Sequence, residues 1–416
     1  MRSYILPVLV LLASVTGCST TDRPTPRIGE WRMELDLGGK VLPFSFSLDR
    51  ASDSLWVVII HNGAEQIAVS DVVIVDDSIS IRMPLFDSEF IGKFANDSLI
   101  NGRWYNHLKG PDYSLPFRAL AGAAPRFPIG SSTGFVSGSW ETHFSHGTPD
   151  AYNAIGVFNA DTKGGLTGTF LTETGDYRYL EGGLHNDSLR LSCFDGSHAF
   201  LFEAALNGDS LIGRFWSGSH WQEPWVATRN EEYKLRDPDS LTTLREGYDM
   251  IDFRFPDTEG KLVSRRDEQF RGRVLMVQVM GSWCPNCVDE TRLLQEVYTK
   301  YHDRGLEIIS IAFEKQTDQE RAIEGLQRFK TALDVHYPVL YGGLASKEVA
   351  SAKLPFLEHL MSYPTCVFID RAGRVRRIRT GFYGPGTGQH YEHYKRNLIA
   401  FLEEMLNEHP GAVAQK

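Results

Sequence analysis

The pattern of apolar and polar positions changes character near residue 231. Between residues 29 and 230, short alternating runs are separated by turn residues, which predicts β-strands with one buried face. Asn62-Gly63 separates the runs 54–60 and 65–69, and Asn207-Gly208 separates 199–206 from 210–216. Asn-Gly supplies the positive φ angles of a tight hairpin turn. We therefore predict an all-β region, the β region, built from consecutive hairpins.

The β region is a duplication. Three short patterns recur in the same order at an offset of about 110 residues: 29–31 with 138–140, 77–81 with 187–191, and 97–104 with 209–216. We predict β repeat 1 at 29–122 and β repeat 2 at 130–230, each a sandwich or barrel-like unit of about eight strands. Four tryptophans are predicted core residues, with the lining of a ligand cavity as the alternative: Trp31, Trp104, Trp140 and Trp216.

Residues 231–247 are charged and read as a linker. Beyond them, the apolar runs 274–280 and 306–313 predict strands that are covered on both faces. Apolar residues at helical spacing follow in 293–301, 323–333 and 391–405. The alternation predicts an α/β domain at 248–408, with a mixed sheet and helices on both of its faces.

The N-terminus has the pattern of an export signal. An apolar stretch from Ile5 to Val15 is too short to span a bilayer as a helix, and it ends in Val15-Thr16-Gly17-Cys18. This order resembles the lipobox of bacterial lipoproteins, in which the cysteine is acylated. We therefore expect a signal peptide at 1–17, a lipid anchor on Cys18 and a tether at 18–28. The expected location is the cell envelope, at the outer membrane facing the periplasm.

Composition limits the classes of partner. The 416 residues carry 43 Lys and Arg against 53 Asp and Glu, a formal charge of −10, so the chain as a whole does not attract nucleic acid. Five cysteines are too few for a disulfide-stapled scaffold of this length. The length fits two or three domains.

The candidate chemistry lies in residues 283–287, Trp-Cys-Pro-Asn-Cys. This C-x-x-C motif follows a buried strand and opens a helix. We expect Cys284 to be exposed at the start of that helix, where backbone N–H groups and the helix dipole favour its thiolate. A thiolate is the attacking species in thiol–disulfide exchange, so we call residues 248–408 the redox domain. A four-thiolate zinc site would need a second cysteine pair, and Cys193 and Cys366 stand alone. We expect no metal site and no cofactor.

Residues 248–408 resemble the thioredoxin fold, and specifically the TlpA-like thiol-disulfide oxidoreductases of bacterial envelopes. The resemblance rests on 253–261, Gly272-Arg273, the motif at 283–287 and Tyr363-Pro364-Thr365. It covers about two fifths of the chain and leaves out the β region. It implies that Cys284 is the nucleophile and that Cys287 resolves the mixed disulfide.

The resemblance also implies the surroundings of the two cysteines. Pro364 would be cis and face the pair, and Trp283 and the Tyr363 backbone would contact the substrate. Glu290 would accept a proton from Cys287. The alternative is that Glu290 has no catalytic role and is present because the helix dipole favours an acid in the first turn. The buried carboxylate common in thioredoxins, six residues before the first cysteine, is replaced by Gln278.

Four other features have plainer interpretations. Glu314 ends a predicted strand beside that of Cys284 and is expected to be a surface acid, with a place at the same sheet edge as Cys284 as the alternative. Cys366 is expected to be a buried unreactive thiol, although a third redox thiol is the alternative. His390 and His393 lack further metal ligands. Four arginines are expected to form a solvated face: Arg374, Arg376, Arg377 and Arg379.

The leading functional prediction is an envelope-tethered thiol-disulfide oxidoreductase that reduces protein disulfides. Its partners would be protein disulfides or thiols and a membrane-embedded electron donor. One alternative is a peroxiredoxin-like peroxidase, but Gly281 and Val277 stand where that class has a threonine and a proline. The other is a ligand-binding β module with an accessory redox domain. The direction of electron flow stays open.

Overall fold

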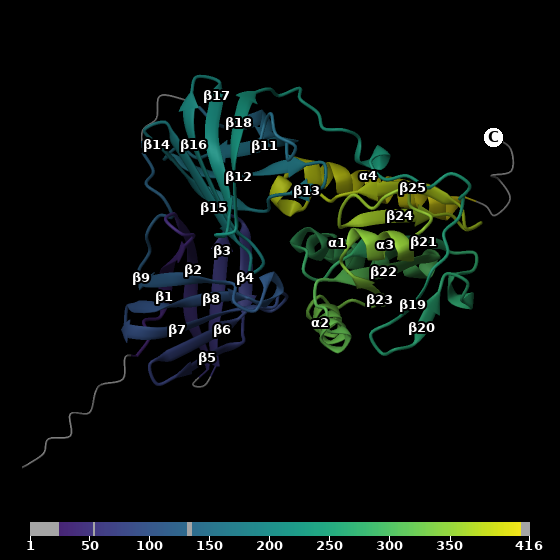
Figure 1. The fold of residues 1–416 in the computed structure, drawn as a ribbon, viewed down its shortest axis with the longest axis horizontal. Helices are drawn as coiled ribbons and strands as arrows, with labels where there is room; N and C mark the ends of the chain where they lie inside the picture. Colours follow the sequence, from purple (N-terminus) through teal and green to yellow (C-terminus); the bar gives the residue numbers. More distant parts are fainter. Residues whose placement is uncertain (1–24, 53–54, 131–134, 409–416) are drawn as a thin grey trace, which may run out of the picture.

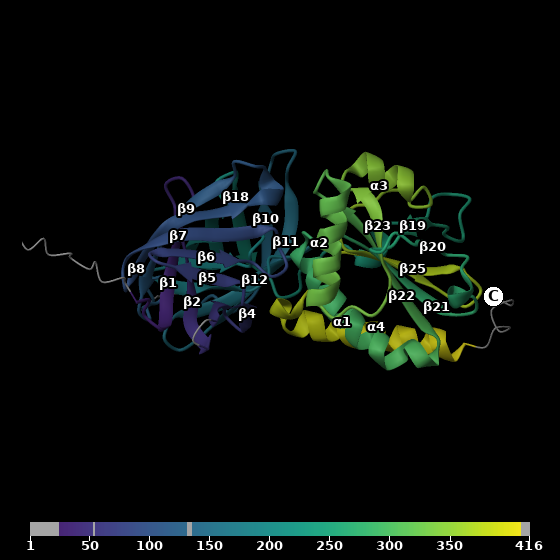
Figure 2. The same cartoon turned by 90° about the horizontal axis from the view of Figure 1, so that it is seen from below.

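The computed structural model describes residues 25–52, 55–130 and 135–408. Cys18 and the expected signal peptide lie outside these residues. Figure 1 shows the β region and the redox domain side by side, with α1 and the strand β13 near their border, and Figure 2 shows the same arrangement from below. Among the described helices, none is long and apolar enough to cross a membrane.

The first repeat forms one antiparallel sheet in the order β4-β3-β2-β1-β9-β8-β7-β6-β5. Its strands alternate buried and exposed positions, as the sequence pattern predicts. Their bounds are β1 Gly29–Asp36, β2 Val41–Ser52, β3 Leu55–Asn62, β4 Glu65–Val69, β5 Val72–Val75, β6 Ser78–Arg82, β7 Ser88–Asn96, β8 Leu99–Asn106 and β9 Ser114–Ala121, with a short helix η1 at His107–Lys109.

The second repeat forms a sheet that closes on itself. Its order is β11-β10-β18-β17-β16-β15-β14-β12-β13, and β11 also pairs with β12, which closes the sheet and leaves the two-residue β13 paired with β12 alone. Each repeat therefore has nine strands, one more than predicted. The bounds are β10 Gly138–Phe144, β11 Tyr152–Ala160, β12 Gly165–Thr172, β13 Gly175–Asp176, β14 Leu180–His185, β15 Ser188–Phe194, β16 Ala199–Asn207, β17 Ser210–Ser217 and β18 Trp221–Arg229.

The tryptophans that open the two repeats make the same contact. The indole N–H of Trp31 donates to the Arg27 carbonyl, and that of Trp140 donates to the Val136 carbonyl, in each case four residues upstream. Both rings are buried, as is Trp104, so they are core residues rather than the lining of an open cavity. The duplication is thus visible in the packing as well as in the sequence.

The expected equivalence of Trp104 and Trp216 is wrong. The burial patterns of β8 and β17 match when Gly102 is aligned with Gly213, and this register pairs Trp104 with Phe215. Both of these side chains are buried, whereas Trp216 points to the other face and is half-buried. A shift of one residue along a strand moves a side chain to the opposite face of the sheet.

The redox domain has a five-stranded mixed sheet in the order β23-β22-β21-β24-β25. β21 and β22 run parallel, as do β22 and β23, while β24 and β25 are antiparallel to their neighbours. The strands are β21 Val274–Met280, β22 Leu306–Glu314, β23 Val339–Leu344, β24 Thr365–Ile369 and β25 Val375–Thr380, and the helices are α1 Pro285–Tyr301, α2 Gln319–Ala332, α3 Lys347–Lys353 and α4 Gln389–Asn407. Shorter elements are η2 Pro238–Ser240, β19 Arg254–Pro256, β20 Leu262–Ser264, η3 Glu268–Phe270, η4 His302–Arg304 and η5 Pro385–Thr387.

Alternation along β21 divides the core of the redox domain into two layers. Met276 and Met280 pack in the cluster that contains the apolar residues of α1 and α4. Leu275 and Val277 belong to a second cluster on the opposite face, together with residues of α3 and of the β19–β20 hairpin. Gln278 lies between Met276 and Met280 in the alternation, so its side chain is buried on the same face, toward α1.

The expected linker packs on the redox domain, next to the arginines that were predicted to form a solvated face. The Thr380 hydroxyl is 2.7 Å from that of Thr242, and Asp239 forms ion pairs with Arg377 and Arg379 at 3.3 and 3.2 Å. Arg374 and Arg376 pair with Asp370, and Arg376 also with Glu408. The prediction of a solvated basic face is wrong, because nearby Asp370 and the more distant Asp239 and Glu408 neutralise these arginines.

Candidate active site

Cys284 is the N-cap residue of α1. Its Sγ accepts the N–H of Cys287 at 3.3 Å, and the thiol lies 3.6 Å from the Tyr363 carbonyl, to which it can donate. An N–H that points at the sulfur at a helix N-terminus stabilises negative charge there. The geometry therefore suits Cys284 to nucleophilic attack.

Cys284 is only 7% exposed, so the prediction of an exposed sulfur is wrong. The reason is that segments of the β region pack around the start of α1. Phe86, from the loop between β6 and β7, belongs to the same apolar cluster as Cys284 and Cys287. The Ser197 hydroxyl, from the loop between β15 and β16, donates to the Trp283 carbonyl at 3.3 Å.

Cys287 is fully buried one turn into the helix. Burial, followed by its hydrogen bond to Cys284, raises the pKa of the Cys287 thiol well above its ordinary value. All four cysteines in the described residues are free thiols. The two sulfurs of the motif are thus held close together but in different environments.

Trp283 and Tyr363 pack against the apolar cluster that contains Cys284, and Pro364 follows Tyr363. The peptide bond between Tyr363 and Pro364 is cis, as the family resemblance implies. The rings of Trp283 and Tyr363 meet edge to face with centroids 5.6 Å apart, and the Trp283 indole N–H donates to the Phe313 carbonyl at 2.9 Å. The loop of the cis proline therefore lies directly against the C-x-x-C motif, as a substrate-binding edge requires.

Glu290 lies in a buried polar network beneath the active site. Its carboxylate accepts the Gln278 amide N–H at 2.9 Å, and burial raises its pKa to about 7. The Gln278 carbonyl oxygen accepts from the hydroxyls of Ser310 and Thr291 at 2.6 and 3.3 Å. The charge of Glu290 acts on Cys287, raising the pKa of that thiol. A carboxyl with a pKa near 7 is matched to proton exchange at neutral pH.

Glu314 is a residue that sequence reasoning placed wrongly. It is 4% exposed, and its carboxylate accepts the backbone N–H of Ser282 at 2.9 Å and the Ser282 hydroxyl at 2.7 Å. Burial raises its pKa to about 7. The expected surface acid instead anchors the turn that leads into Cys284, since the carboxyl ends of parallel strands share one edge of the sheet.

Cys366 is buried opposite Gln278 in the β21–β24 ladder and next to Glu290. Burial, and then the charge of Glu290, raise the pKa of this thiol well above its ordinary value. Such a thiol is a poor nucleophile. Elsewhere, His393 is 2.9 Å from the Asn397 amide. In the part of the chain that the structure describes, no group of three His, Cys, Asp or Glu side chains could hold a metal ion.

Comparison with known proteins agrees with this geometry. Residues 247–378 match the AhpC/TSA family. The thiol-disulfide oxidoreductase ResA of Bacillus thuringiensis is 27% identical over 155 residues, which cover 36% of this chain and 78% of that protein. The thioredoxin-like protein YneN of Bacillus subtilis is 24% identical, over 33% of this chain and 73% of that protein.

Among solved structures, a thiol:disulfide interchange protein of the thioredoxin family from Chlorobium tepidum is 19% identical. The match has a TM-score of 0.30 and covers 39% of this chain and 99% of that one. The family match and the relatives, together with the mixed sheet described above, show that the C-terminal part of this chain is a thioredoxin-fold domain similar to those of thiol-disulfide oxidoreductases.

Proposed function

We propose that this protein is an envelope-tethered thiol-disulfide oxidoreductase that reduces protein disulfides through Cys284 and Cys287. The observation that carries the proposal is the position of the Cys284 sulfur. It accepts the Cys287 N–H at the start of α1 and faces the Tyr363 carbonyl beside the cis proline. This arrangement supports attack by Cys284 on a disulfide bound along the Tyr363–Pro364 edge.

The reaction proceeds in two exchanges. The Cys284 thiolate attacks one sulfur of the client disulfide, forms a mixed disulfide and releases the first client thiolate. Cys287 then loses its proton to Glu290 and attacks the Cys284 sulfur, which releases the second client thiolate. The client gains two electrons and becomes a dithiol, while Cys284 and Cys287 form a disulfide. A membrane-embedded dithiol donor would return the protein to its reduced form by the reverse exchanges.

The location outside the cytoplasm follows from the N-terminal pattern. Acylation of Cys18 would hold the chain at the outer membrane facing the periplasm, with residues 18–28 as the tether. A single acyl chain binds membranes weakly, so stable anchoring by Cys18 needs the several chains that a lipobox cysteine would carry.

The test of the activity is reduction of insulin by the purified protein in the presence of dithiothreitol, followed as turbidity. We expect turnover by the wild type, loss of turnover in Cys284→Ser and in Cys287→Ser, and full turnover in Cys193→Ser, which replaces a buried cysteine of the β region. Insulin reduction that survives Cys284→Ser would refute the proposal.

The same preparations separate the alternatives. Rapid consumption of hydrogen peroxide that survives Cys287→Ser would indicate a peroxidase. A small molecule that stays bound to the β region, with binding indifferent to Cys284→Ser, would indicate the binding-module function. We expect neither result.

A further inference from the structure

Three loops of the β region meet the segments that form the redox site. The turn between β12 and β13 supplies Thr174, whose carbonyl accepts the Ser362 hydroxyl at 3.0 Å, next to the cis-proline loop. Asp176, in β13, accepts the Gly384 N–H on its carboxylate at 2.6 Å. Its backbone carbonyl lies 3.4 Å from the side-chain amide of Asn286, which stands between the two cysteines. These contacts come in addition to those of Ser197 and Phe86 described above.

Arg178 connects these loops to the active-site helix. It lies between β13 and β14, is 4% exposed, and has a φ of 64°. This left-handed conformation is unfavourable for a residue other than glycine, so it persists only where surrounding contacts hold it. Backbone strain of this kind at a buried charged residue points to a contact under functional constraint.

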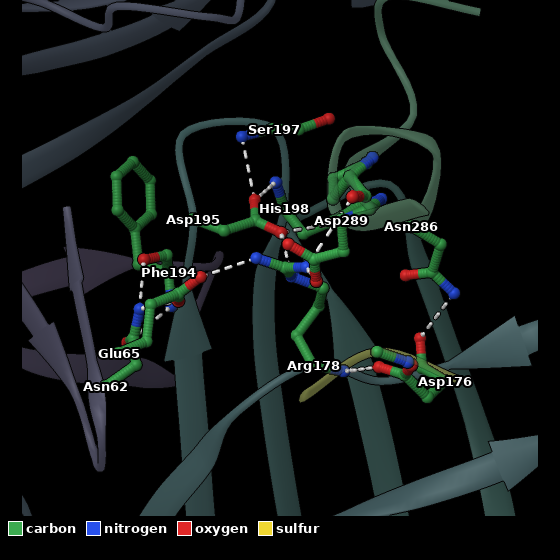
Figure 3. Close-up of polar contacts among 12 residues, drawn as sticks. Asn62, Glu65, Asp176, Arg178, Phe194, Asp195, Ser197, His198, Asn286 and Asp289 are labelled. Carbon is green, nitrogen blue, oxygen red and sulfur yellow. Dashed lines mark hydrogen bonds and ion pairs between the residues drawn. The ribbon is translucent and has the colours of Figure 1, made fainter. Parts of the chain in front are cut away.

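The guanidinium of Arg178 bonds to carboxylates from three separate parts of the molecule (Figure 3). It pairs with Asp289 on α1, with Glu65 on β4 of the first repeat, and, at 3.7 Å, with Asp195 in the loop that follows β15. It also lies 3.5 Å from the Pro285 carbonyl, inside the C-x-x-C motif. One side chain thus joins both β repeats to the first turns of the active-site helix.

Asp195 extends this network to Trp283. One of its carboxylate oxygens accepts the N–H groups of Ser197 and His198 at 2.8 and 2.6 Å. Burial raises the pKa of Asp195, but His198 and Arg178 outweigh burial and hold it at about 2. The ionised carboxylate fixes the loop from which the Ser197 hydroxyl reaches the Trp283 carbonyl.

The cluster is charged and buried, so its integrity depends on Arg178. Removing the guanidinium would break the ion pair of Glu65 and would leave Asp289 and Asp195 with only Arg292 and His198 as partners. Breaking a buried ion pair by deleting one partner is strongly unfavourable, and separation of the surfaces lets water solvate the remaining charges. Loss of Arg178 should therefore favour movement of the β region away from α1.

We propose that the β region is a cover over Cys284 that selects substrates by size, and that Arg178 is the specificity-determining contact that holds it in place. With the cover docked, small disulfides and narrow extended segments reach the sulfur, whereas bulky protein surfaces are excluded until the interface opens. The inference rests on the proposed function for its substrates, but the docking itself can be measured without turnover.

The test compares a small and a bulky reagent on the full-length protein. The rate of alkylation of Cys284 is measured by mass spectrometry with iodoacetamide and with a maleimide that carries a long polyethylene glycol chain. Turnover is measured with a small aromatic disulfide and with insulin. In Arg178→Gln, we expect the rate with the bulky probe divided by the rate with the small probe to rise on the order of tenfold, for alkylation and for turnover alike. The rate with the small probe alone should change by less than about twofold.

Two further variants complete the design. Arg190→Gln removes a half-exposed arginine of the same β repeat, whose ion pair to Glu203 is 3.9 Å long, and should leave both ratios unchanged. Gly384→Ala disturbs the interface while leaving Arg178 itself in place, because the added methyl group would lie 2.8 Å from an Asp289 carboxylate oxygen. It should also raise both ratios, and it replaces Arg178→Gln in the test if that variant does not fold.

The outcomes are distinct. Unchanged ratios in both interface variants, or access of the bulky reagent to wild-type Cys284 as fast as in Arg178→Gln, would overturn the inference. A changed labelling ratio without turnover of either disulfide in any variant would support the cover and refute the oxidoreductase proposal instead.

Discussion

The side-chain amide of Gln278 donates a hydrogen bond to the Glu290 carboxylate at 2.9 Å, in the buried space between β21 and α1. Gln278 occupies the position at which many thioredoxins carry an acid. A glutamine carries no proton that titrates, but its N–H stabilises the ionised form of Glu290 and opposes the effect of burial. In the proposed mechanism, the proton-accepting role therefore passes from the strand to Glu290 on the helix, one turn beyond Cys287.

This relationship predicts how substitution of Gln278 changes the pH dependence of resolution. In Gln278→Leu, loss of the hydrogen bond should raise the pKa of Glu290 further, so release of the mixed disulfide should require a higher pH. We expect the pH profile of the second exchange, measured by stopped flow, to shift upward by about one unit. Gln327→Leu removes a glutamine that donates to the Thr258 carbonyl away from the site, and it should leave the profile unchanged. An unshifted profile in Gln278→Leu would argue against Glu290 as the proton acceptor.

A second prediction concerns the division of labour between the cysteines. Cys287→Ser should accumulate mixed disulfides with client proteins through Cys284, because the resolving thiol is gone, while Cys284→Ser should accumulate none. The measurement is non-reducing electrophoresis of tagged variants from the envelope fraction, with adducts identified by mass spectrometry. Glu290→Gln should slow resolution by about a hundredfold without slowing the first attack. Adducts that appear only with Cys284→Ser would reverse the assignment.

The two buried glutamates predict a loss of stability with rising pH. Burial raises the pKa of Glu290 and of Glu314 to about 7 from an ordinary value of 4.5. Between these values the folded protein keeps protons that the unfolded chain has released. The stabilising contribution is therefore complete below about pH 4.5 and is lost as the pH rises through 7.

We expect the free energy of unfolding of the reduced protein to fall between pH 5 and pH 8, by up to about 3 kcal/mol for each of these carboxyls. Urea titrations at several pH values measure this change. Glu290→Gln and Glu314→Gln should each remove part of the slope, and the double variant should remove most of it. An equal slope in the wild type and in the double variant would contradict the prediction.

The lipid anchor is tested by fractionation. Cys18→Ala should move the protein from the membrane fraction to the soluble fraction or stop its processing, since acylation needs the cysteine sulfur. The intact mass of the wild type should include a diacylglycerol group on Cys18. Cys193→Ala serves as the control, because this cysteine is buried in β15 and should not affect membrane association. An unlipidated mature protein would exclude the anchor.

Much of this molecule could be predicted from local sequence. Alternating runs, Asn-Gly turns and helical spacing depend on neighbours close along the chain, so they predict the duplicated all-β region and the mixed α/β sheet. The C-x-x-C motif between a buried strand and a helix likewise determines that Cys284 begins α1 and that Cys287 lies one turn further in. The positions of Gln278 and Glu290 on facing elements follow from the same periodicities.

Only the tertiary structure decided what surrounds those residues. Local patterns predict that the strand ending in Glu314 lies beside that of Cys284, but not that the carboxylate turns inward to accept hydrogen bonds from Ser282. Nor do they indicate that Arg178 reaches Asp289, 111 positions away, and closes the β region over Cys284. Such contacts join segments that no local pattern relates. They form because buried charges must find partners of opposite sign, and the packing of whole domains determines which partners are within reach.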